Sequence, residues 1–471
     1  MTAPLRARVR VWDDAACARV HEASCRVLAE TGAEVRHPRA LELLRQAGAG
    51  VTGTRARLPR ELVERALASA ARRCVLKGRA ADGSLDRELA DGNTWYGTGP
   101  DCLYVDDPAV GRRRAHLSDV ERFARLAEQL PNIDFVMSMG LPDDADIERI
   151  DLVQLAAMLA GTRKPIVVSS PFGGAPLRIM VEMAAACGEA ASLGCLVMSS
   201  PPLQLDEICL DKLFVCAELD VPVVLAPAPS AGSTAPASIT AVVVVANAEV
   251  LAGLVVHQLA RAGAPFLYGA GVGVLNMRTM VDAYRPPGVA LGNQAAIDLA
   301  HWYGLPSWAY AGDSDSKLFD EQAGAESALA TVLGELSGAT LLHDVGYLES
   351  GLQSSFEALV LGDGLIGYAR ALSEELPVDD AALALDEIMA AGPGGNHLAR
   401  PLTRSRYRRF LTTDLLDQSP HERWQAEGAT TLKQRVAART AQLLGGDATF
   451  TLDPTVRRRL DDIVAQAPPG R

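Results

Sequence analysis

Short apolar segments recur along the middle of the chain, each followed by a cluster of Gly, Ser or Pro and then by a helical pattern. Their starts are 26 to 44 residues apart, the length of one strand followed by one helix. Apolar residues are continuous within each segment, as expected for a parallel strand that is covered on both faces. The eight segments are residues 94–97, 133–138, 165–170, 195–200, 221–227, 265–270, 306–311 and 339–344.

Several of these segments open with a residue followed by proline, at Pro165, Pro222, Pro265 and Pro306. Proline is tolerated at the first position of a strand, so this placement supports the assignment. Eight strand–helix units in series predict an α/β protein with a TIM (β/α)8 barrel. The alternative is an open, doubly wound sheet. The glycine-rich run at 269–273 comes too late in the chain, and without a clear helix start, to predict a dinucleotide site.

The regions before and after the predicted barrel have a different pattern of apolar residues. Residues 1–90 carry Ala, Leu and Val at helical spacing, which predicts a helical N-terminal extension. Residues 376–471 contain helical patterns near 383–392 and 432–444, and we expect them to form a tail that packs on the barrel. The predicted division is therefore 1–90, 91–375 and 376–471.

Composition excludes several classes of protein. The chain is 48% hydrophobic, far above the level of a disordered protein. With 45 basic and 58 acidic residues its net charge is −13, which argues against a nucleic-acid partner. The first twenty residues resemble no secretory signal and the apolar runs are too short to cross a bilayer, so we expect a cytoplasmic protein without a membrane partner. Eight cysteines without a CxxC pair indicate reduced thiols.

Aromatic side chains gather near the predicted strand ends, where a TIM barrel places its chemistry. Ring faces attract quaternary ammonium groups, so these residues are candidates for binding a cationic substrate. Packing in the core or at the rim is the alternative for each of them. The candidate aromatic residues are Trp95, Tyr96, Trp308, Tyr310 and Tyr347.

Titratable groups are scarce at these strand ends. His343 and Asp313 are the candidates for catalysis, and we also expect His343 to contact the polar end of the substrate. A purely structural imidazole, held by Asp344, is the alternative. Ser199, Ser200 and Gly312 would lie at the barrel mouth, where a cofactor would be contacted. No cluster of His, Cys and carboxylates has metal-ligand spacing, so we predict no bound metal.

Seven motifs, in their order along the chain, resemble those of the trimethylamine methyltransferase family, whose fold is a TIM barrel. The resemblance extends over nearly the whole chain. The motifs are Asn132-Ile-Asp-Phe, Gly232-Ser-Thr-Ala-Pro with Ala246-Asn-Ala-Glu, Asp315-Ser-Lys with Asp320-Glu-Gln-Ala, His343-Asp-Val-Gly-Tyr-Leu and Gly392-Pro-Gly-Gly.

The founding members of that family carry pyrrolysine in the barrel. This chain contains 20 ordinary residue types and has Ala311-Gly-Asp-Ser near the corresponding position, within 310–315. It is therefore similar to the branch without pyrrolysine, that of glycine betaine methyltransferase. The resemblance implies transfer of a methyl group from a betaine-type quaternary amine to the Co(I) corrinoid of a separate protein, which docks over the barrel mouth. We also expect a homo-oligomer.

Two other functions stay open at this point. One is a different TIM-barrel enzyme, a lyase or isomerase that uses His343 and Asp344 as acid and base; its pH–rate profile would follow one histidine and it would need no cobalamin. The other is a non-catalytic betaine-binding protein, which would bind ligand tightly and transfer no methyl group. Fold alone does not decide between them.

Overall fold

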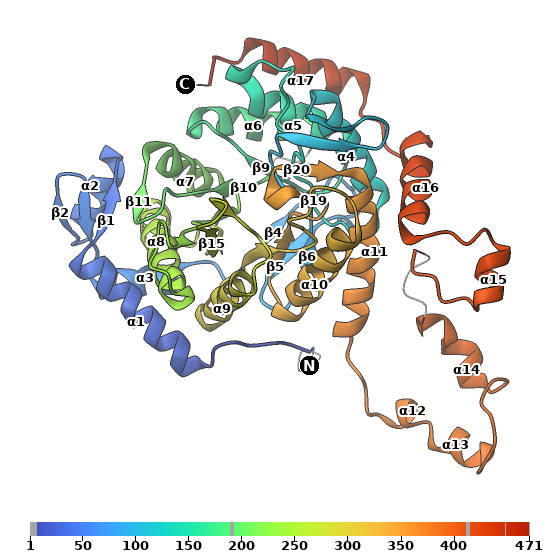
Figure 1. Ribbon diagram of the computed structural model, residues 1–471. Helices are drawn as coiled ribbons and strands as arrows, with labels where there is room; N and C mark the ends of the chain where they lie inside the picture. Colours follow the sequence, from blue (N-terminus) through green and yellow to red (C-terminus); the bar gives the residue numbers. More distant parts are fainter. Residues whose placement is uncertain (1–6, 189–192, 411–414, 448, 471) are drawn as a thin grey trace.

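The middle of the chain forms a closed barrel of eight parallel strands (Figure 1). The computed structural model describes residues 7–188, 193–410, 415–447 and 449–470. Pairing of Leu341 with Trp95 joins the last strand to the first and closes the barrel. The second strand is reduced to bridges from Gly97 to Phe135 and from Val136 to Ile166, and Tyr268 bridges to Ser307. The order around the barrel is β6 (Trp95–Tyr96), residues 135–136, β9 (Ile166–Ser169), β10 (Leu193–Val197), β12 (Val223–Leu225), β14 (Phe266–Tyr268), β17 (Trp308–Tyr310) and β18 (Leu341–His343).

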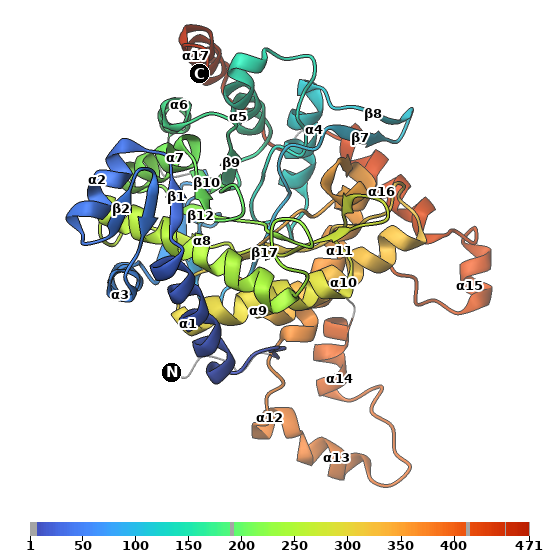
Figure 2. The ribbon, with the colours of Figure 1, turned by 60° about the vertical axis from the view of Figure 1, so that its left-hand side comes forward.

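This closure confirms the predicted TIM barrel and excludes the open sheet, and every strand lies within a predicted apolar segment or begins two residues before one. Eight helices surround the strands, one after each (Figures 1 and 2). They are α4 (Leu117–Gln129), α5 (Ile150–Gly161), α6 (Gly174–Ala186), α7 (Glu207–Leu219), α8 (Ile239–Ala260), α9 (Pro287–Tyr303), α10 (Glu321–Ser337) and α11 (Phe356–Ser373).

Helix α8 is long and apolar enough to cross a membrane. In the structure it is a core helix: 72% of its most apolar window is buried. Its two polar interruptions, Asn247 and Glu249, are buried as well. α8 packs against α7 and α9, and on its outer side against the N-terminal extension.

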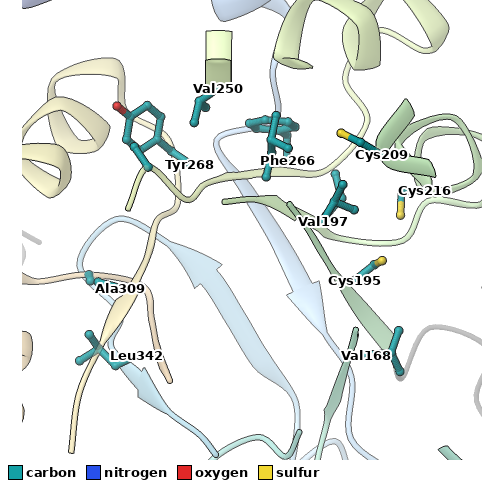
Figure 3. Packing of buried hydrophobic residues seen from close by; sticks show 14 of the residues in the cluster. Val168, Cys195, Val197, Cys209, Cys216, Val250, Phe266, Tyr268, Ala309 and Leu342 are labelled. Atoms are coloured by element: carbon teal, nitrogen blue, oxygen red, sulfur yellow. The ribbon is translucent and has the colours of Figure 1, made fainter. Parts of the chain in front are cut away.

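The apolar core has two layers, one inside the barrel and one between the barrel and its helices. Alternate strand residues point to opposite sides, so Leu196 faces inward while Cys195 and Val197 face the helices. Figure 3 shows the outer layer, where strand residues meet Cys209 and Cys216 of α7 and Val250 of α8. All eight cysteines are free thiols.

A hairpin closes the amino-terminal end of the barrel. Strands β4 (Arg73–Leu76) and β5 (Arg87–Ala90) pair antiparallel below β6. Leu76 and Leu89, one from each strand, are fully buried and belong to the cluster that fills the barrel interior. The prediction of a purely helical N-terminal extension was therefore wrong for this segment, because its short alternating strands are stabilised by the barrel that they cap.

The rest of the N-terminal extension lies against α8. It contains helices α1 (Asp14–Glu30), α2 (Pro38–Gln46) and α3 (Arg60–Ser69). Between them, β1 (Ala33–Val35), β2 (Gly50–Thr52) and β3 (Arg55–Arg57) form a small sheet that the sequence did not predict. β1 also pairs with β11 (Gln204–Leu205), so this sheet is joined to the loop that follows barrel strand β10.

At the opposite, carboxyl-terminal end, the loops build small sheets around the barrel mouth. β7 (Tyr104–Asp107) and β8 (Gly111–Arg114), after the first strand, pair with β19 (Tyr347–Leu348) and β20 (Gln353–Ser355), after the last. A second sheet combines β13 (Ser230–Ala231), β15 (Gly273–Asn276) and β16 (Val281–Asp282).

The C-terminal region contains two different parts. Helix α16 (Leu432–Gly445) packs on α11 and α4, and α17 (Pro454–Gln466) packs on α5 and α6. Before them, the chain leaves the end of α11 and extends away from the barrel (Figures 1 and 2). This extended part carries the short helices α12 (Asp380–Leu383), α13 (Leu385–Ala391), α14 (Pro401–Arg406) and α15 (His421–Ala426).

Candidate active site

An aromatic stack lies inside the barrel where its last two strands end. Trp308 and Tyr310 of β17 and His343 of β18 are alternate residues of neighbouring strands, so their side chains share the inner face. The Trp308 and His343 rings are stacked, with centroids 4.2 Å apart and planes 20° apart. The Tyr310 ring is tilted against His343 at 4.8 Å. Trp308 begins its strand, so it lies deeper than Tyr310 and forms the floor of this group.

His343 is held from one side and free on the other. Its Nδ1 lies 2.5 Å from Oδ1 of Asp344, within hydrogen-bond distance, and this contact orients the ring. Its Nε2 is buried without a hydrogen-bond partner within the described residues. A buried polar atom without a partner is unfavourable, so this nitrogen is suited to contact a ligand.

Asp313, in the loop after β17, is a second buried polar group. Nη2 of Arg285 lies 3.0 Å from its Oδ2. Burial raises the pKa of Asp313 to about 6, against the opposing effect of Arg285. Arg285 and Tyr310 also line a cavity of about 40 Å³ between α9, α10 and β17. That volume suits ordered water and is too small for an organic amine.

Two further tyrosines close the mouth. The Tyr347 hydroxyl donates to the carbonyl oxygen of Pro100. A Cβ on Gly99 would lie 2.3 Å from both Asp344 Oδ1 and Tyr347 Cζ, so this approach requires glycine. Tyr284 lies 5.8 Å from Tyr310, between ring centroids.

Tyr310 itself reaches across the barrel mouth. Its hydroxyl oxygen would be 2.9 Å from a Cβ at Gly271, in the loop that follows β14. The glycines of this loop thus leave room for the ring of a neighbouring strand, which gives them a packing role.

A carboxylate that sequence analysis missed, Asp101, lies at the end of the first two strands. Its Oδ1 accepts hydrogen bonds of 2.9 Å from Ser138 and from Gln154. Burial raises the pKa of Asp101, while these donors lower it. The residue has a φ of 55°, in the left-handed region, so its backbone departs from the strand direction.

The serines after β10 are engaged in structural contacts. The Ser199 hydroxyl donates to Oε2 of Glu249 on α8 at 2.6 Å, and the Ser200 hydroxyl donates to Asp206 at 3.1 Å. Glu249 also accepts from the Leu203 amide at 2.9 Å. Burial raises the pKa of Glu249 to about 7.

Gly312 follows β17 with a φ of 69°, and a Cβ there would lie 3.2 Å from the Val345 backbone. It therefore allows the loops after the last two strands to approach each other.

Trp95 and Tyr96 lie apart from the other candidates. Trp95 pairs with the first residue of β18, and its indole donates to the carbonyl oxygen of Glu88 in the closing hairpin. The Tyr96 side chain points outward, where its hydroxyl donates to Glu335 of α10 at 2.7 Å. The prediction that residues 94–97 contain a barrel strand is confirmed by β6. The register of β6 against β18, however, places the Trp95 and Tyr96 rings away from the barrel mouth.

The arrangement combines ring faces, carboxylates and one unpaired imidazole nitrogen. Within the described residues no group of three or more His, Cys, Asp or Glu side chains is placed to hold a metal ion. Aromatic rings and carboxylates attract the cationic end of a ligand. His343 Nε2 offers one polar contact to the opposite end of such a ligand. Arg285 and Asp101 were missed because each lies in a loop several residues past its strand. An acidic residue four positions after Gly97 was the available signal for Asp101.

The family described as trimethylamine methyltransferase (MTTB) matches residues 3–468. The chain belongs to the trimethylamine methyltransferase family. It is 32% identical to a glycine betaine methyltransferase of Desulfitobacterium hafniense strain Y51, over 95% of each chain. It is 28% identical to the trimethylamine methyltransferase MttB of Methanosarcina barkeri, over 95% of this chain and 93% of that one.

Membership of the trimethylamine methyltransferase family makes the chain an enzyme, a methyltransferase of the corrinoid-dependent class. Its fold is similar to that of the monomethylamine methyltransferase MtmB of Methanosarcina barkeri, with a TM-score of 0.52. That match covers 96% of this chain and 94% of the other at 11% identity, so it bears on the fold alone.

Proposed function

We propose that the enzyme transfers a methyl group from a betaine-type quaternary amine, such as glycine betaine, to the Co(I) corrinoid of a separate protein. The observation that carries this proposal is the stack of Trp308, His343 and Tyr310 beneath the barrel mouth, with a free imidazole nitrogen. The 32% identical glycine betaine methyltransferase supports the same class of substrate.

The site suits a molecule with a cationic head and an anionic tail. In the proposed pose the carboxylate of the betaine points down to His343 Nε2, which donates a hydrogen bond to it while Nδ1 faces Asp344. The trimethylammonium group then lies higher, beside the Tyr310 ring and within the field of Asp101 and Asp313. A methyl group therefore faces the opening.

The reaction needs positioning more than proton transfer. The carbon–nitrogen bond breaks with its electron pair on nitrogen, which releases a neutral tertiary amine, while cobalt(I) supplies the pair for the new carbon–cobalt bond. No proton is gained or lost in this displacement. Holding the methyl group in line between nitrogen and cobalt is the main contribution that the protein makes.

The rim of the mouth supports docking of a partner protein. Large apolar side chains are exposed on the loops after four different barrel strands, and exposed apolar surface that extends over several segments is typical of a site of protein association. They are Met198 after β10, Met277 and Met280 after β14, Leu318 after β17 and Leu352 after β18. We propose that the corrinoid protein covers these residues when its cofactor enters the mouth.

The direct test mixes the purified enzyme with cob(I)alamin and a panel of amines, and follows methylcob(III)alamin by absorbance. We expect glycine betaine or a related betaine to react and trimethylamine not to react. Reaction with trimethylamine alone, or with no amine of the panel, would overturn the substrate class.

A pair of variants tests the proposed pose. Tyr310→Leu removes the ring beside the ammonium group and should raise the Kd for glycine betaine about tenfold, the size of a partly desolvated cation–π contact. Trp95→Leu removes a ring at the opposite end of the barrel and should leave the Kd within twofold. Equal effects of the two variants would contradict the pose.

A further inference from the structure

The extended segment after α11 is an arm that its own barrel does not cover. We define the arm as residues 374–408, which leave the barrel at the end of α11 (Figure 1). Its helices α12, α13 and α14 have four, seven and six residues. Isolated helices this short are unstable in water, so the arm needs a partner surface to hold its shape.

Apolar side chains along the arm are left in solvent. Leu376 is 90% exposed, Leu398 83% and Val378 81%. Ile388 and Met389 of α13 are exposed too. The surface continues onto α11, where Tyr368 and Leu372 are exposed one turn apart and lead directly into the arm. An apolar surface of this extent marks a site of protein association.

Charge is separated along the arm. All six of its acidic residues lie in the first half, at 374, 375, 379, 380, 386 and 387, with no basic residue among them. The second half carries Arg400, Arg404, Arg406 and Arg408 and no acidic residue. The Gly392-Pro-Gly-Gly395 turn separates the two halves.

We propose that two copies of the chain form a dimer through their arms, which lie antiparallel about a two-fold axis. A two-fold interface must be complementary to itself. In this arrangement the acidic half of each arm faces the basic half of the other, and the exposed leucines of both are buried between them. The 35 residues of the arm exceed the roughly 20–30 per side of a standard stable interface.

Charge-changing variants test the proposal, because loss of the dimer through unfolding of the arm would not be reversed by mixing two variants of opposite charge. One variant, Glu375→Lys/Asp380→Lys/Asp386→Lys, leaves three acidic and three basic residues in the first half of the arm and so removes its net negative charge. A second, Arg404→Glu/Arg406→Glu/Arg408→Glu, makes it acidic. These positions exclude Asp379, which caps α12, and Glu387, which accepts from the Leu402 amide. The control Arg19→Glu/Arg55→Glu/Arg458→Glu changes the same number of exposed arginines outside the arm.

The mass of each full-length protein is measured by light scattering during size-exclusion chromatography. We expect a wild-type dimer, and a dimer Kd raised at least roughly 100-fold in each arm variant, because the attraction between the two halves is lost in the first variant and becomes a repulsion in the second. Mixing the two arm variants should restore association, because the basic half of the first variant then faces the acidic half of the second. The control should resemble wild type.

Three results would overturn the proposal. The first is a wild-type chain that stays monomeric at high micromolar concentration, which would assign the arm to another protein. The second is a dimer that both arm variants keep intact. The third is a pair of arm variants that dissociate and do not associate when mixed, although circular dichroism shows them folded.

Discussion

Glu249 is a carboxylate whose burial should make the enzyme less stable as the pH rises. Only 1% of the residue is exposed, and its two hydrogen-bond donors, the Ser199 hydroxyl and the Leu203 amide, carry no positive charge. Burial raises its pKa from 4.5 to about 7. Replacement by glutamine keeps the size and both hydrogen bonds, because an amide accepts from Leu203 with its oxygen and donates to the Ser199 oxygen.

The sign and size follow from the two pKa values. Between pH 4.5 and 7 the folded protein binds the proton more tightly than the unfolded chain, so stability falls as the pH rises through this window. The two pKa values differ by about 2.5, and each pKa unit corresponds to ~1.36 kcal/mol. Burial of ionised Glu249 therefore lowers the free energy of unfolding by about 3 kcal/mol at pH 8. At pH 5 the remaining penalty is below about 1 kcal/mol.

Thermal unfolding of wild type and Glu249→Gln at pH 5 and pH 8 measures this penalty. At about 2.1 cal/mol/K per residue, 471 residues have an unfolding entropy near ~1 kcal/mol/K. The variant should therefore gain about 3 °C in Tm at pH 8 and under about 1 °C at pH 5. Glu182→Gln, at an exposed position of α6, is the control and should change neither value. An equal gain at both pH values, or a loss at pH 8, would refute the reasoning.

Three further predictions concern the site and the hairpin. His343→Ala should weaken betaine binding roughly 10- to 100-fold, the worth of one hydrogen bond to a charged group, with unchanged far-UV circular dichroism; normal binding would make His343 structural. In wild type, betaine affinity should fall below pH 6 as Asp313 protonates, and isothermal titration of Asp313→Asn should show a flatter profile between pH 5 and 7. Leu76→Ala should lower the free energy of unfolding by about 2–5 kcal/mol, measured by urea denaturation, because the hairpin residue fills the barrel end.

The barrel was predictable because its strands are buried on both faces and so are continuous apolar segments. Proline at the first residue of the segment marked strands such as β9 and β14 in the sequence. The hairpin β4–β5 was not recognised because Arg73–Leu76 and Arg87–Ala90 are separated by ten residues and each strand buries a single residue, Leu76 or Leu89. Its stability comes from the barrel interior, which no local pattern reveals.

Part of the candidate site could be predicted from the sequence, namely the aromatic stack, whereas contacts between distant loops could not. Trp308, Tyr310 and His343 were found together because each ends or begins a strand that the sequence marks. The register between β6 and β18, set by long-range pairing, moved Trp95 and Tyr96 away from them. Arg285 reaches Asp313 from a loop that follows a different strand, and such a contact depends on closure of the whole barrel.

Among the described residues, the hairpin β4–β5 closes the amino-terminal end of the barrel, which leaves the mouth at the carboxyl-terminal end as its opening. Under the proposed function, the amine and the corrinoid protein must both use the barrel mouth, so the binding steps of one turnover have a compulsory order. The amine enters while the mouth is open, the partner arrives afterwards, and the demethylated product leaves after the partner has gone. Excess corrinoid protein should then slow turnover by trapping the empty enzyme, and a high amine concentration should relieve this inhibition because both compete for the free enzyme.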